Sequence, residues 1–65
     1  MDLAIEVLGE RLRVRASRSG RHWTLVAELF PEVRVCALDL ARAKLLLAKR
    51  LRPQVERLRR RRAAG

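Results

Sequence analysis

The first part of the chain alternates between apolar and polar positions. Leu3, Ile5 and Val7 are separated by small or charged residues, and residues 11–16 read RLRVRA. A period of two is typical of a strand that buries one of its faces. The pattern therefore predicts neighbouring strands over residues 2–8 and 11–16.

A helix over residues 2–12 is the alternative. Leu3, Val7 and Leu12 also approximate one helical face. Gly9 inside such a helix would cost about 1 kcal/mol relative to alanine. We therefore favour the strands.

Three turns would connect the apolar stretches into an antiparallel meander of four strands, or of three if residues 2–8 were helical. We expect these turns at Gly9-Glu10, at Ser19-Gly20 and at residues 30–32. Glycine in the first position of a two-residue loop is typical of a type II′ hairpin.

The three turns define a register that gives the sheet one apolar face and one polar face. On the apolar face they pair Val7 with Leu12, Ala16 with Trp23, and Leu29 with Val33. On the polar face they pair Glu6 with Arg13, Arg11 with Glu28, and Glu28 with Arg34. Agreement between three independent turns favours a sheet with one buried side.

From Asp39 onward the pattern changes to the period of a helix. The Asp39 carboxylate can accept backbone N–H groups of the first turn, as an N-cap does. Apolar residues then recur three or four positions apart, at Leu40, Ala43, Leu47 and Leu51. The sequence therefore predicts an α+β fold, in which one main helix packs on one face of a four-stranded antiparallel sheet.

The end of this helix is expected at Pro53, or a kink just before it, because proline lacks an N–H and clashes with the carbonyl four residues back. Val55 and Leu58 continue the apolar spacing and predict a short, kinked helical extension. The run RRRRAAG that follows is typical of a frayed tail. We therefore divide the chain into one domain over residues 1–58 and a basic tail over residues 59–65.

A chain of 65 residues holds one small core. Such a domain buries only about 60% of its unfolded surface, so we expect a homo-oligomer, with dimer and tetramer both open. The N-terminus lacks the features of a signal peptide, and no apolar run is long enough to span a membrane. A lone cysteine, Cys36, cannot form an internal disulfide. We expect a cytoplasmic protein without a membrane partner.

The formal net charge is +9, from 16 basic and seven acidic residues. This excess favours an anionic partner such as nucleic acid or an acidic protein surface. The alternative is that the charge is compositional, because alanine, leucine and arginine dominate the chain, as GC-rich genomes tend to encode.

Residues 23–51 carry a recognisable order of short motifs. They read WTLVAEL, then FPEV around the Pro31 turn, then RVCA, then DLARAKLLLAKRL beginning at Asp39. This order resembles the HicB-like antitoxin family, whose members have an aromatic strand ending in Ala-Glu, a proline-containing turn, a further strand and a capped helix. The preceding strand LRVRAS extends the likeness in topology to about residue 11.

The resemblance implies the α+β fold, homo-oligomerisation through sheet or helix faces, and a non-catalytic role in a toxin–antitoxin pair. The partner it implies is a small basic toxin, HicA. The chain would then be a stand-alone relative without the DNA-binding domain of full-length antitoxins. It differs from the family in being strongly basic, with net charge +9, and in having a shortened proline turn.

Few residues favour catalysis. His22 is the only histidine and lies beside a turn. Catalysis would need a nucleophile, a base and an orienting group within reach of one another, and the residues around His22 do not provide that set. Metal-ligand spacings, glycine-rich phosphate loops and paired carboxylates are lacking from the sequence. We therefore expect neither an enzyme nor a bound cofactor or metal. We assign Trp23 to the core. Val26 and Cys36 adjoin on the polar face and form a candidate oligomer interface.

Arginines at every second position form the other candidate site. Arg11, Arg13, Arg15 and Arg34 share the polar sheet face in the predicted register, and Arg18 lies near the hairpin tip. Sheets with outward basic residues can enter the major groove of DNA. The alternative function is therefore a small nucleic-acid-binding protein that uses these five arginines, aided by the basic tail.

Overall fold

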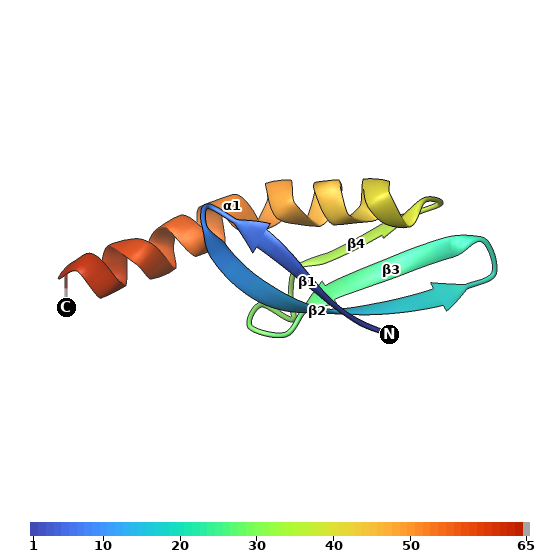
Figure 1. Cartoon of the computed structure of the whole chain (residues 1–65), viewed down its shortest axis with the longest axis horizontal. Helices are drawn as coiled ribbons and strands as arrows, with labels where there is room; N and C mark the ends of the chain where they lie inside the picture. Colours follow the sequence, from blue (N-terminus) through green and yellow to red (C-terminus); the bar gives the residue numbers. More distant parts are fainter. Residues whose placement is uncertain (65) are drawn as a thin grey trace.

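The computed structural model describes residues 1–64 and shows an α+β fold (Figure 1). Within the described residues, four antiparallel strands form one open sheet in the order β1-β2-β3-β4, and a single long helix packs against it. This confirms the predicted fold class, and residues 2–7 are strand rather than helix. The elements are β1 (Asp2–Val7), β2 (Glu10–Ser19), β3 (His22–Ala27), β4 (Arg34–Ala37) and α1 (Leu40–Ala64).

The first hairpin turns one residue earlier than predicted. Its central residues are Leu8 and Gly9, with φ of 52° and 80°, and Val7 is paired with Glu10. Two central residues with positive φ are characteristic of a type I′ turn, whose twist matches that of the flanking strands. The prediction of a type II′ turn at Gly9-Glu10 was wrong, because a leucine occupies a backbone region that rarely holds one.

All three strand registers are shifted by two residues from the predicted ones. Ala16 is paired with Leu25 rather than Trp23, and Ser19 is paired with His22, so that the second turn is Gly20-Arg21. Val35 is paired with Leu25 in the third hairpin. A shift of two leaves every side chain on its predicted face, since the side-chain period of a strand is also two.

The third connection is longer than predicted. Residues 28–33 form a loop in which the Val33 N–H donates to the Phe30 carbonyl at 2.9 Å. Leu29, which was predicted to pair with Val33 on the buried face, is 65% exposed. Phe30 and Val33 instead pack against the edge of the core.

The core lies between α1 and the apolar face of the sheet. Alternate residues of β1 to β4 meet a stripe of α1 that includes Leu47 and Leu51, both fully buried. Among residues 1–64, twelve side chains are buried: Ile5, Val7, Leu12, Val14, Ala16, Leu25, Ala27, Val35, Ala43, Leu47, Leu51 and Val55. Trp23 is half-buried at the margin of this cluster.

Helix α1 begins as predicted but does not end at Pro53. The Asp39 carboxylate accepts a hydrogen bond from the Arg42 N–H at 3.3 Å, which confirms the cap. The helix then runs through Pro53 to Ala64, and Figure 1 shows its second half at an angle to the first. Val55, two residues after the proline, is fully buried. Its packing offsets the energetic cost of the backbone hydrogen bond that Pro53 cannot donate.

Candidate functional site

The net charge of the chain lies entirely on α1. Residues 1–39 contain six arginines and six carboxylates, so their formal charge is zero. Residues 40–65 contain ten lysines and arginines against one carboxylate, Glu56. The structure therefore joins a formally neutral sheet to a helix of charge +9.

Four of the predicted arginines do share the sheet face that points away from α1. Arg11, Arg13 and Arg15 alternate with the buried residues of β2, and Arg34 precedes buried Val35 on β4. Carboxylates on the same face balance most of their charge. In the register of β1 and β2, Asp2 lies opposite Arg15 and Glu6 lies opposite Arg11. The Arg15 Nε also lies 4.0 Å from the Glu28 Oε1.

This outer sheet face therefore carries four arginines and three carboxylates. Glu6 was predicted opposite Arg13 and Glu28 opposite Arg11 and Arg34; Glu6 instead lies opposite Arg11, and Val26 is the partner of Arg34. Exposed pairs of this kind contribute only about 0–1 kcal/mol each to stability. Their effect on function is larger, because they leave little field for an anionic partner.

Arg18 does not join the other four arginines. It is paired with Trp23 across β2 and β3, and it lies on the same side of the sheet as the core. Its guanidinium carbon is 5.8 Å from the centre of the Trp23 ring, and its Nε donates to the Gly20 carbonyl at 3.3 Å. Arg18 therefore covers the open end of the core by a cation–π contact.

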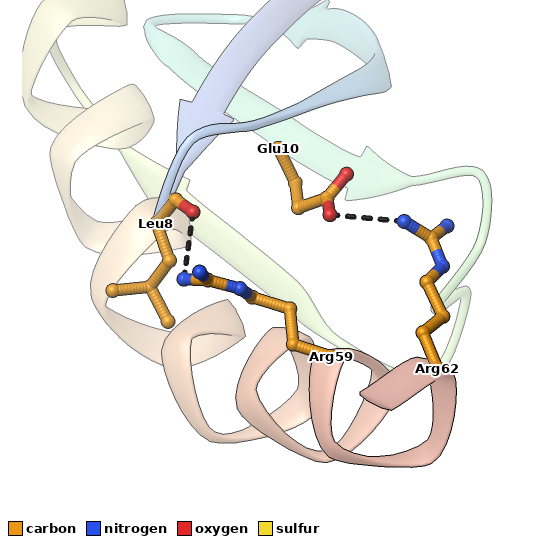
Figure 2. Close-up of polar contacts among 4 residues, drawn as sticks. All are labelled: Leu8, Glu10, Arg59 and Arg62. Carbon is orange, nitrogen blue, oxygen red and sulfur yellow. Dashed lines mark hydrogen bonds and ion pairs between the residues drawn. The ribbon is translucent and has the colours of Figure 1, made fainter. Parts of the chain in front are cut away.

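Residues 59–64 are helical, and two of their arginines attach them to the β1–β2 hairpin. Arg59 donates to the Leu8 carbonyl at 3.0 Å, and the Arg62 guanidinium lies 2.9 Å from the Glu10 carboxylate (Figure 2). The prediction of a frayed tail over residues 59–65 was wrong for residues 59–64, which form the last turns of α1. Gly65 lies outside the described residues.

These two contacts orient the remaining basic residues of the distal helix. Arg57, Arg60 and Arg61 are exposed and form no ion pair within residues 1–64. Arg42, Lys49, Arg50 and Arg52 are likewise exposed along the proximal part. Figure 1 shows α1 running past the β1–β2 turn, so that its distal turns project beyond the sheet. The result is an elongated basic surface, which we call the α1 basic surface: Arg42, Lys49, Arg50, Arg52, Arg57, Arg60 and Arg61.

Sequence reasoning missed this surface because it placed the candidate site on the sheet arginines and treated residues 59–65 as a frayed tail that only aids them. One signal was available. After Asp39 the chain contains a single acidic residue among 26 positions, whereas residues 1–39 hold six basic and six acidic residues.

The remaining candidates lie apart from the α1 basic surface. His22 and Cys36 are exposed on the sheet, and the Thr24 hydroxyl lies 3.9 Å from the Cys36 sulfur. Val26 is half-buried on the same face, diagonal to Cys36. Within residues 1–64, no three histidine, cysteine or acidic side chains gather as they would around a metal ion.

Helix α1, as far as the structure describes it, is too polar to cross a membrane. Comparison with protein-family models, curated proteins and solved structures gives no match to this chain.

Proposed function

We propose that this protein is a non-catalytic module that binds the phosphate backbone of nucleic acid along the α1 basic surface. The observation that carries the proposal is the separation of charge, with +9 on one helix and a formally neutral sheet. A surface of one sign attracts polyanions and releases their condensed counterions on binding.

The dimensions of α1 favour a duplex. A helix of 25 residues is about 37 Å long, close to the 34–36 Å of one turn of duplex DNA. Aromatic platforms, on which single strands stack their bases, are lacking from its sequence. The α1 basic surface consists of arginines and lysines, which can contact phosphate oxygens whatever the base sequence.

The salt dependence of binding tests this proposal. If four to six cations of the α1 basic surface each neutralise a phosphate, log K should fall against log salt with a slope of about −3.6 to −5.4. Fluorescence anisotropy with a labelled duplex of about one and a half turns measures that slope. Absence of binding at ~50 mM salt, where phosphate contacts are strongest, would refute the proposal.

An antitoxin-type module is the second candidate function. It is favoured by the order of elements in residues 23–51, where two strands flank the Pro31 turn and an Asp39-capped helix follows. The α1 basic surface would repel a basic toxin, so such a partner would contact the neutral sheet. Co-elution with a HicA-type toxin, unchanged by competing duplex, would favour this function over nucleic-acid binding.

We also propose self-association through the outer sheet face at Val26 and Cys36. This face has nearly balanced charge, so two copies do not repel each other there, and Val26 offers an apolar contact beside the Cys36 thiol. The expected result is a melting temperature that rises with protein concentration. A Val26→Lys variant should lose that dependence, and a monomeric mass at micromolar concentration would contradict the proposal.

A further inference from the structure

A groove follows the free edge of β1, between that strand and α1. It has a volume of about 500 Å³ and is lined by Ala4, Ile5, Ala41, Leu45 and Ala48, together with Glu6 and Lys44. A second hollow continues it toward Lys49 and Arg52. We propose that this edge and groove bind an extended, acidic segment of a partner protein, which adds to the sheet as a fifth strand beside β1.

The backbone of β1 offers the hydrogen bonds that such a strand needs. Met1 and Ala16 exchange both backbone hydrogen bonds, at 2.8 and 3.0 Å. Bonded pairs alternate along an antiparallel ladder, so the odd-numbered residues of β1 bond to β2. The N–H and C=O groups of Asp2, Ala4 and Glu6 therefore point to the free edge, where β-augmentation takes place.

The groove offers apolar contacts for alternate side chains of that strand. Ala41, Leu45 and Ala48 follow one another at spacings of four and three on the side of α1 that faces β1. Leu45 is 67% exposed, although it stands between two small residues beside the core. The small side chains of Ala41 and Ala48 leave space on the helix surface for apolar side chains of a partner, and the exposed Leu45 side chain lies between these two spaces.

The charges around the groove decide which occupant fits. Lys44, Lys49 and Arg52 line it on the helix side, against the single carboxylate of Glu6. A second copy would pair β1 with β1 about a two-fold axis, which sets two α1 helices of charge +9 side by side. With that axis at Ala4, Asp2 would also lie opposite Glu6, and like charges directly opposite are destabilising. An acidic and apolar segment meets neither penalty.

A synthetic peptide tests the proposal. The probe is a labelled seven-residue peptide with glutamate at both ends and two central valines, all separated by threonines. Glutamates and valines then fall on one face of the strand and meet the groove, since successive side chains alternate. Binding to the intact chain is measured by anisotropy, and the same peptide with lysine in place of glutamate should bind at least about tenfold more weakly if the groove selects acidic ends.

The variant Ala4→Pro removes the outward N–H at the centre of the edge. That N–H makes no bond to β2, and proline is tolerated on edge strands in this position, so the fold should persist. Peptide affinity should fall about tenfold or more. Ala4→Ser, which keeps the N–H, is the matched control and should bind as the wild type does.

A second pair of variants tests the charge. Lys49 lines the continuation of the groove, and Lys49→Glu reverses its charge. Arg50→Glu makes the same change of charge one residue away, at a position that does not line the groove. Lys49→Glu should weaken the peptide about fivefold and Arg50→Glu by less than about twofold.

Equal losses in the two charge variants, or unchanged affinity in Ala4→Pro, would overturn the proposal. Failure of the acidic peptide to bind at millimolar concentration would do the same. A dimer that dissociates in Ala4→Pro would show instead that a second copy occupies the edge.

Discussion

Replacing Leu47 with alanine is expected to destabilise the domain by about 2–5 kcal/mol, the range for deleting a fully buried leucine side chain. Leu47 is fully buried at the centre of the stripe by which α1 contacts the sheet. Small domains have about 5 kcal/mol of stability or little more. We therefore expect Leu47→Ala to retain only about 0–3 kcal/mol of stability and to unfold at a much lower urea concentration than the wild type, which circular dichroism during urea titration would show.

Leu45→Ala is the matched control for this prediction. It makes the same substitution two residues away on the same helix, but Leu45 is 67% exposed. Its effect on the free energy of unfolding should remain below about 0.5 kcal/mol, as for most surface changes. Equal destabilisation by the two variants would mean that the contact face of α1 has been assigned wrongly.

The second large effect is expected when the two groups of arginines are removed separately. A helix variant changes Arg52, Arg57, Arg60 and Arg61 to glutamine, and a sheet variant changes Arg11, Arg13, Arg15 and Arg34 to glutamine. Both remove four charges, and both spare Arg59 and Arg62, which hold α1 to the β1–β2 turn.

The helix variant should reduce the slope of log K against log salt by about three to four, because each lost phosphate contact removes about 0.9. The sheet variant should change that slope by less than about one, since its arginines already lie beside Asp2, Glu6 and Glu28. Thermal melts of both variants establish that the fold is retained. A larger loss of slope in the sheet variant than in the helix variant would identify the sheet face as the binding surface. Equal losses of slope would indicate unspecific attraction of the nucleic acid to any polycation.

Much of this architecture is determined locally. The period of two assigns a face to every residue of the strands, and that assignment holds for Ile5, Val14 and Leu25 even though their partners differ from the predicted ones. The Asp39 cap and the spacing of Ala43, Leu47 and Leu51 likewise identify the start of α1 and its buried stripe. These features depend on residues a few positions apart, so the sequence alone contains them.

The register depends on more than the period. A slip of two residues keeps every face the same, and only the turn conformation distinguishes the two arrangements. Leu8 adopts a φ of 52° in the first turn, and this costs energy for a residue other than glycine. Partial burial of Leu8 against the core helps to offset that cost, and such a contact cannot be read from the turn sequence.

The end of α1 and the charge balance of the outer sheet face were decided by the tertiary structure alone. Arg59 contacts Leu8 and Arg62 contacts Glu10, which lie 51 and 52 positions earlier in the chain. Val55 is buried although it follows Pro53. These contacts hold in a helix a segment whose local sequence, a proline followed by a run of like charges, disfavours one. The charge balance of the sheet also needed the tertiary structure, because the carboxylates beside the sheet arginines come from β1 and from the loop after β3. The excess of cations on α1, in contrast, depends on the sequence of the helix itself, which holds one carboxylate.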